Sequence, residues 1–229
     1  FELPLNTSIG RYHRNPIFLY VVYEMIRYAD AVRVYSKSME EITKKINPKV
    51  YLLRSYFDFS LIENIKPVTH EKIKIVYATS RGNADTLAQI CIPAIEKILK
   101  EFSGKVAFYT FGSLPEQLKH LKNAHQLEYI PNYNEYISFF YKQGFDIGLA
   151  PLYDDRFHNS KTNNKFREYG AMEVCGIYSN TALYRECVTD RVTGMIVENT
   201  IESWYEAVRE LIENSTLRKS IKDKAKRNI

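Results

Sequence analysis

Residues 145–152, FDIGLAPL, decide the fold, because they form a nearly continuous apolar run. Such a run is typical of a central parallel strand that helices cover on both faces. Working outward from it, the sequence predicts five further strands, over 72–79, 105–112, 126–130, 176–180 and 194–199. Helices are expected between and after them, over 84–102, 115–122, 133–142, 162–174, 201–213 and 216–227. This alternation predicts a Rossmann-like α/β fold with a doubly wound parallel sheet.

The first seventy residues predict a smaller set of elements. We expect a helix over 17–29, a strand over 29–36, a helix over 38–46 and a strand over 49–58, with residues 1–16 as a loop. Ser38 and Glu41 have the spacing of a capping box at the start of the second helix. We therefore interpret 1–70 as the C-terminal part of a first α/β domain whose beginning is missing, and 71–229 as a complete second domain.

The composition bounds the class of protein. Of 229 residues, 45% are apolar, which is enough to build a full core, and no stretch is apolar for long enough to span a bilayer. The net charge of +5 suits an anionic small molecule or a membrane surface and argues against nucleic acid as a partner. Cys91, Cys175 and Cys187 form neither a disulfide framework nor a metal-binding pattern, which predicts a reducing cytoplasm.

Candidate ligand-binding residues follow two of the predicted strands of the second domain. Ligands of open parallel sheets bind beyond the carboxyl ends of the strands. Arg81 and Gly82 follow the first strand, where a glycine lets a phosphate come close to backbone and helix N–H groups. After the fourth strand, Lys161, Lys165 and Glu168 are spaced so that a helix would place them on one face. An ordinary turn and a solvated Lys/Glu face remain alternatives on these residues alone.

The segment 161–204 resembles the donor-site block of GT-B glycosyltransferases close to family four. That block runs from a carboxylate-bearing helix through a Gly-Ile strand and a Thr-Gly strand to a Trp-bearing helix, and the matching residues here are Glu168, Gly176–Ser179, Thr193–Val197 and Trp204. Ala29–Asp30, Ser36 and Ser55–Asp58 resemble the end of the first domain of these enzymes. The resemblance therefore covers nearly the whole chain.

The match departs from the family at two places. Most members carry a pair of glutamates in this block; Glu168 fits the second, and Lys161 stands in place of the first. A branch of polysaccharide-assembly glycosyltransferases resembles the sequence better, through Asn159, Lys161, Lys165, Glu168 and Tyr169. The family's lysine after Arg-Gly is absent at 83–85, which leaves Lys161 or Lys165 to compensate.

The resemblance implies a nucleoside-diphosphate sugar as the donor. The expected donor-binding residues are Glu168, Lys165, Lys161, Arg81, Gly82, Asn159 and Tyr133. Glu168 is expected to accept hydrogen bonds from two ribose hydroxyls, the cations to bind the diphosphate, and Tyr133 to meet the nucleobase. Because preorganised cations can stabilise the leaving group, we expect neither a metal nor a cofactor. The sequence does not name a catalytic residue.

The expected activity is transfer of a sugar to a glycan or lipid-linked acceptor, retaining and independent of metal, in the cytoplasm. Contact of the basic last helix with a membrane is one option, and packing of that helix on protein is the other. Two alternatives stay open: a nucleotide-sugar epimerase, which would need carboxylates and a histidine in the cleft, and a non-catalytic nucleotide-sugar-binding module. This chain alone should bind nucleotide and transfer sugar poorly.

Overall fold

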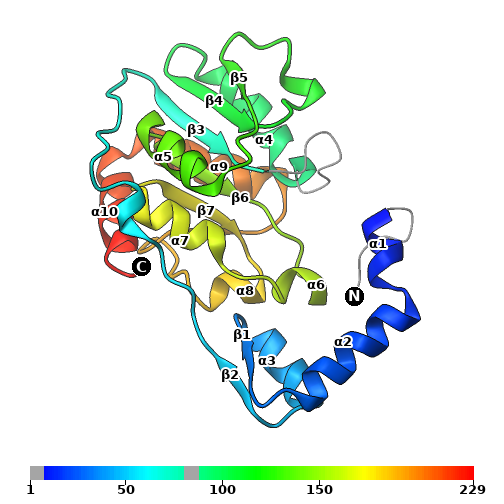
Figure 1. Ribbon diagram of the computed structural model, residues 1–229. Coiled ribbons are helices and arrows are strands. Elements are labelled where there is room, and N and C mark those ends of the chain that lie inside the picture. Colours follow the sequence, from blue (N-terminus) through cyan, green and yellow to red (C-terminus); the bar gives the residue numbers. More distant parts are fainter. Residues whose placement is uncertain (1–7, 80–87) are drawn as a thin grey trace. The chain divides into compact units, whose positions relative to one another are not determined.

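The computed structural model describes residues 8–79 and 88–229, whose helices and strands Figure 1 shows. They divide into two compact units. The sheet unit comprises Tyr56–Tyr153, Asn164–Asn180 and Tyr184–Ile229. The N-terminal unit comprises residues up to Ser55 together with Asp154–Asn163 and Thr181–Leu183. The assignment of 1–70 and 71–229 to parts of two GT-B domains stays a prediction.

In the described part of the sheet unit, six parallel strands form the central layer. They are β3 (Ile73–Tyr77), β4 (Val106–Phe111), β5 (Ala124–Leu127), β6 (Ile147–Ala150), β7 (Cys175–Ser179) and β8 (Met195–Val197). Their order in the sheet is β5-β4-β3-β6-β7-β8. The strand order reverses between β3 and β6, as in a Rossmann fold, which confirms the predicted fold class. Ligands of such sheets bind beyond the carboxyl ends of the strands at this reversal.

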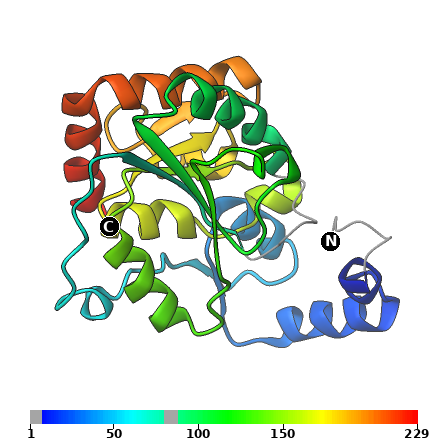
Figure 2. The same ribbon diagram turned by 90° about the horizontal axis from the view of Figure 1, so that it is seen from above.

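Helices cover both faces of this sheet, as Figure 2 shows. On one face lie α4, described over Ala88–Glu101, and α9 (Ile201–Glu213), which pack against each other. On the other face lie α5 (Tyr133–Gln143) and α7 (Asn164–Ala171). The last helix, α10 (Ser215–Lys226), packs against α7, α9 and β7. The second option predicted for α10, packing on protein, therefore holds for its apolar stripe, with Ile221 and Ala225 buried.

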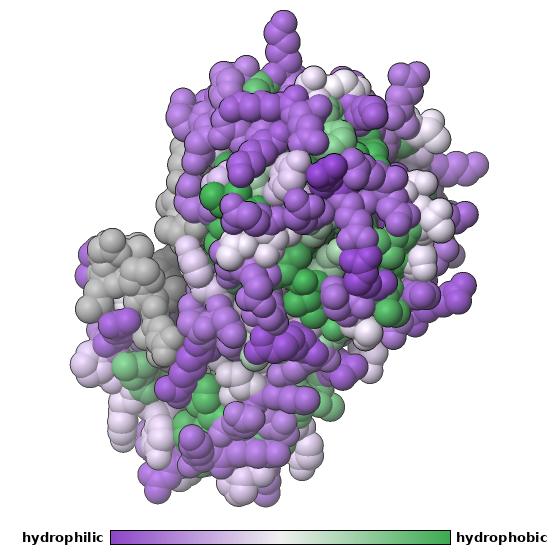
Figure 3. Space-filling view, turned by 180° about the vertical axis from the view of Figure 1, so that it is seen from behind, coloured by the Kyte–Doolittle hydropathy of each residue, from purple (hydrophilic) through white to green (hydrophobic). Residues whose placement is uncertain are grey.

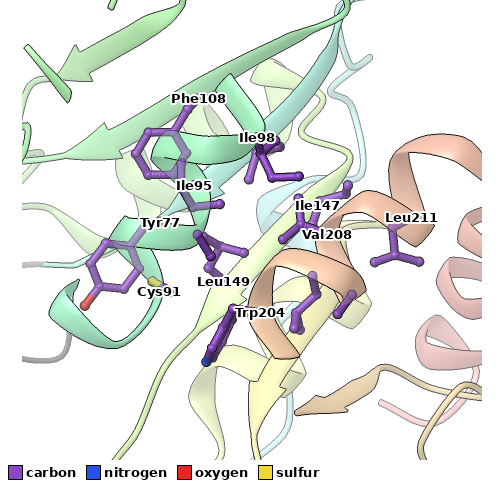
Figure 4. Close-up of a cluster of buried hydrophobic side chains, with 14 of the residues drawn as sticks. Tyr77, Cys91, Ile95, Ile98, Phe108, Ile147, Leu149, Trp204, Val208 and Leu211 are labelled. Atoms are coloured by element: carbon purple, nitrogen blue, oxygen red, sulfur yellow. The ribbon is translucent and has the colours of Figure 1, made fainter. Parts of the chain in front are cut away.

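The face of α4 and α9 holds the aliphatic core (Figure 4). Alternate residues of the strands point into it, among them Ile147 and Leu149 of β6, and both are fully buried. From the helices come Ile95, Trp204 and Val208, also fully buried. The alternation of β6 splits its apolar run between this core and the opposite face, which is why the run appears continuous in the sequence.

Aromatic rings fill the opposite face, and two glycines make room for them. A Cβ at Gly148 of β6 would lie 2.6 Å from Cε2 of Tyr169, and a Cβ at Gly176 would lie 2.1 Å from the hydroxyl oxygen of Tyr178. Tyr169 of α7 therefore rests directly on β6, where its hydroxyl donates to the carbonyl of Leu149 at 2.9 Å. This close approach fixes the height of α7 above the sheet.

Hydrogen bonds with residues of β7 and of the segment after β8 also hold the chain after β6 in place. The N–H of Leu152 donates to Oγ of Ser179, which in turn donates to Oδ1 of Asn199 at 2.6 Å. The amide of Asn199 closes the ring by donating to the carbonyl of Leu152. Both backbone groups of Leu152 thus keep hydrogen-bond partners beyond the end of the ladder, as buried polar groups require.

The N-terminal unit contains α1 (Ser8–His13), α2 (Pro16–Tyr28), β1 (Val32–Val34), α3 (Lys37–Lys44) and β2 (Val50–Leu52). The strands β1 and β2 are parallel to each other. The prediction of a loop over 1–16 is wrong for α1. The predicted cap is wrong as well: Oγ of Ser36 accepts from the N–H of Met39 and begins α3, whereas Oγ of Ser38 lies 3.2 Å from Oγ of Ser160.

Other element boundaries differ from the prediction. β5 ends at Leu127, so the predicted strand over 126–130 is displaced. The loop after β6 contains a short helix, α6 (Arg156–Asn159), and a second short helix, α8 (Ala182–Arg185), follows β7. Helix α7 begins at Asn164, two residues later than predicted. This last difference matters for the candidate site.

The surface is predominantly hydrophilic where Figure 3 shows it, with apolar side chains gathered in patches between polar ones. Among the helices of the described residues, none combines the length and the apolar character needed to cross a bilayer.

Candidate functional site

A pocket of about 270 Å³ lies at the carboxyl edge of the sheet, within the sheet unit. Ala78 and Thr79 follow β3, Phe111 ends β4, and the remaining lining comes from the loop after β5 and the first turns of α5 and α7. The remaining lining residues are Tyr129, Ile130, Pro131, Tyr133, Tyr136, Asn164, Lys165 and Glu168. The pocket therefore opens where a doubly wound sheet receives its ligand.

Local sequence explains why α5 and α7 present these residues here. Oδ1 of Asn132 accepts from the N–H groups of Asn134 and Glu135, so α5 begins at Tyr133. Tyr133 and Tyr136 are three positions apart and share one face of that helix. α7 is held down by Tyr169 on Gly148, which turns the preceding residue, Glu168, toward the pocket.

Glu168 is the only acidic residue among the described residues that line this pocket. Its side chain is 8% exposed, and each carboxylate oxygen has a partner. Oε2 accepts from Nζ of Lys165 at 3.0 Å, and Oε1 accepts from the hydroxyl of Tyr133 at 3.4 Å. A carboxylate oxygen has more than one acceptor position, so both oxygens can still accept hydrogen bonds from a ligand.

Burial and neighbouring charges fix the protonation states of Lys165, Tyr133 and Tyr136. Burial alone lowers the pKa of Lys165, but the adjacent Glu168 carboxylate outweighs it, so the pKa of Lys165 lies above its usual value. Burial and the same carboxylate raise the pKa of the Tyr133 hydroxyl, and raise the pKa of Tyr136 still further. At neutral pH, Lys165 is therefore an ammonium, and both tyrosines are neutral hydrogen-bond donors.

The structure brings together three of the seven predicted donor-site residues: Glu168, Lys165 and Tyr133. Arg81 and Gly82 lie outside the described residues. Lys161 and Asn159 belong to the N-terminal unit. The prediction that Lys161, Lys165 and Glu168 share a helix face is wrong for Lys161, because α7 begins only at Asn164.

Lys161 and Asn159 have local contacts of their own. Nζ of Lys161 lies 4.7 Å from the ring centroid of Phe157, in a cation–π contact. Nδ2 of Asn159 donates to Oδ1 of Asp154, and its Oδ1 accepts from the N–H of Leu183. Asn159 thus joins the loop after β6 to the start of α8, and its predicted contact with a donor stays a prediction.

Tyr136 and Asn164 complete the pocket and were not among the predicted site residues. The sequence held a signal for the first, since Tyr136 lies one turn after Tyr133 on a predicted helix. Nothing comparable marks Asn164, whose place in the pocket depends on where α7 begins. Of the other aromatic residues near these strands, Tyr129 and Phe111 line the pocket, whereas Tyr109 packs against His125 and Phe145 elsewhere on the sheet.

A larger hollow of about 560 Å³ lies along α9 and the start of α10. Its lining consists of polar and charged residues: Glu206, Arg209, Glu210, Glu213, Asn214, Ser215 and Thr216. Several of these pair with each other or with nearby surface residues, as Arg209 does with Glu213. It holds no buried carboxylate and lies away from the strand ends, so the smaller pocket is the better candidate. In the described parts of the chain, no group of three His, Cys, Asp or Glu residues could hold a metal ion.

Comparisons with known proteins agree with this geometry at the level of the fold. No family model and no curated protein matches the sequence. Among solved structures, sucrose-phosphate synthase from Thermosynechococcus elongatus matches with a TM-score of 0.69 and 13% identity, over 98% of this chain and 59% of that one. Anabaena HepE, solved with UDP and glucose, matches with a TM-score of 0.70 and 12% identity, over 97% and 64%.

A third match is to a C-terminal domain solved on its own. The C-terminal domain of a group 1 family glycosyl transferase, LpcC from Francisella tularensis, matches with a TM-score of 0.52 and 15% identity, over 75% of this chain and 95% of that domain. The chain spans about three fifths of the length of sucrose-phosphate synthase and HepE. These proteins resemble the chain in fold.

Proposed function

We propose that this chain carries the donor-binding site of a glycosyltransferase, and that the pocket at the ends of β3 and β4 receives the nucleoside part of a nucleoside-diphosphate sugar. One observation carries the proposal: a single carboxylate, Glu168, is 8% exposed yet lines a pocket at the carboxyl edge of a Rossmann-like sheet. Two vicinal hydroxyls of a ribose match the two oxygens of such a carboxylate.

The other residues that line the pocket suit the nucleobase of the donor. Phe111, Tyr129, Tyr133 and Tyr136 offer aromatic surface, on which a planar heterocycle can stack. The proteins of similar fold include one solved with UDP and glucose, which supports a nucleotide sugar as the donor here. The proposal extends to transfer with retention of configuration, without metal, to a glycan or lipid-linked acceptor in the cytoplasm.

Calorimetric titration of the purified chain with UDP, GDP, ADP and CDP tests the donor site. At least one nucleotide should bind, and Glu168→Ala should abolish that binding. Glu173→Ala is the matched control, because Glu173 is an exposed glutamate just after the same helix and pairs with Lys226 away from the pocket. Failure of all four nucleotides to bind the wild-type chain, or equal loss in both variants, would refute the proposal.

Activity assays with the nucleotide sugar that binds separate the two alternatives. A non-catalytic module and a transferase would both bind nucleotide, and hydrolysis or transfer of the sugar from the bound donor would distinguish them. An epimerase would convert the donor sugar to its epimer, which chromatography of the free nucleotide sugars would detect.

A further inference from the structure

In the structure, Lys165 is paired with an anion of the protein itself. A lysine in the first turn of a helix opposes the helix dipole, and an anionic ligand such as a diphosphate would compensate for this. In the structure the compensating anion is internal, because Nζ of Lys165 lies 3.0 Å from Oε2 of Glu168, one turn further along α7. The positive charge of Lys165 is thus already neutralised.

The charge balance of the pocket follows from this pair. Among the described residues that line it, Lys165 is the only basic one and Glu168 the only acidic one. The other lining side chains are aromatic, aliphatic, hydroxyl or amide groups. The described part of the lining therefore has no net charge, which fits an uncharged nucleoside.

Glu168 in turn depends on Lys165. A carboxylate that is 8% exposed has lost most of its contact with water, and a cation or hydrogen-bond donors must compensate for that loss. Lys165 supplies the cation, and Tyr133 supplies a longer hydrogen bond of 3.4 Å to the other oxygen. Both contacts approach the carboxylate from the sides of α7 and α5, and together they fix the orientation of its two oxygens.

We propose that Lys165 is a positioning residue: its ammonium neutralises and orients Glu168 for the ribose and is not a partner of the diphosphate. This inference rests on the proposed function and names the part of the donor that the pocket takes. Lys165 acts through Glu168, so it contributes to nucleoside binding and makes no phosphate-specific contribution.

A series of three ligands that differ in their number of phosphates tests the role of Lys165. The wild-type chain and Lys165→Met are titrated with a nucleoside, its monophosphate and its diphosphate, using the base that the wild type prefers. We expect Lys165→Met to lower the affinity for all three ligands by the same factor, about 10- to 100-fold, which is the effect of losing one hydrogen bond to a charged group. Lys142→Met, at the exposed end of α5, removes the same charge and should leave all three affinities unchanged.

Two further variants keep the test decisive if Lys165→Met folds poorly. Lys165→Arg keeps the cation and should restore most of the affinity for all three ligands. Tyr133→Phe removes the other contact to Glu168 and should weaken all three equally, by a smaller factor. An effect of Lys165→Met that is absent for the nucleoside and grows with each phosphate would overturn the inference and leave the proposed function standing. A wild-type chain that binds none of the ligands would refute the proposed function itself.

Discussion

Replacing Gly148 by alanine tests the packing that places the site. Gly148 lies in the middle of β6, and a Cβ there would approach three ring carbons of Tyr169 at 2.6, 2.7 and 2.8 Å. Neither group can move freely, because the ring is fully buried and its hydroxyl is bonded to the carbonyl of Leu149. Overpacking of this kind costs about 1–3 kcal/mol. For a chain of this size, the melting temperature should fall by about 2–12 °C.

The substitution should also weaken nucleotide binding, because Tyr169 follows Glu168 directly on α7. If the helix is lifted from the sheet, the carboxylate moves with it. Thermal unfolding followed by circular dichroism and titration with nucleotide would measure the two effects on the same protein. Gly104→Ala is the matched control: no atom lies within 4 Å of its Cβ, so stability should stay the same or rise by about 0.4–1 kcal/mol.

A double mutant decides whether the ring is the cause. Tyr169→Leu removes the obstructing atoms, so Gly148→Ala should cost less in that background than in the wild type, with a coupling energy of about 1 kcal/mol or more. Equal stability of Gly148→Ala and Gly104→Ala, or strict additivity in the double mutant, would refute the packing argument.

Two further predictions concern the helix start and the buried thiols. Ser36→Ala should destabilise α3 by about 0.5–2 kcal/mol because it removes the side chain that caps the helix, whereas Ser38→Ala should have a smaller effect. Hydrogen exchange of the amides of α3 would measure both effects. A larger effect of Ser38→Ala would contradict the prediction. Burial raises the pKa of the Cys175 thiol to about 12, so at pH 8 it holds very little thiolate. Iodoacetamide should therefore modify the partly exposed Cys187 in the native protein and spare Cys175 until the chain is unfolded, and mass spectrometry of the peptides would show any early modification of Cys175.

The sheet could be predicted from the sequence because burial on two faces makes its central strands apolar at nearly every position. The prediction was displaced at β5, the edge strand, where His125 and Gln126 are exposed. The apolar residues that suggested a strand, Tyr129 and Ile130, come after it and line the pocket instead. An apolar run in the sequence can therefore belong to a strand buried in the core or to the wall of a binding pocket, and only the structure distinguishes the two.

The site was predictable as far as helix spacing applies. Tyr133 and Glu168 were named from a resemblance and from position after a strand, and the structure places both in one pocket. The start of α7 was not predictable to the residue, since neither Asn163 nor Asn164 stands out as a cap in a segment that is polar throughout. An error of two residues was enough to put Lys161 on a helix face to which it does not belong.

The placement of Lys165 shows the limit of arguments from charge. Its position in the first turn of α7 opposes the helix dipole and favours a nearby anion, yet spacing alone cannot say whether that anion is a ligand or another side chain. The sequence predicts Glu168, three residues on, as a separate ligand-binding group, although i, i+3 neighbours on a helix are close enough to pair. The pair changes what the pocket can recognise, because a neutralised carboxylate can hold the hydroxyls of a ribose without repelling the phosphates that follow it.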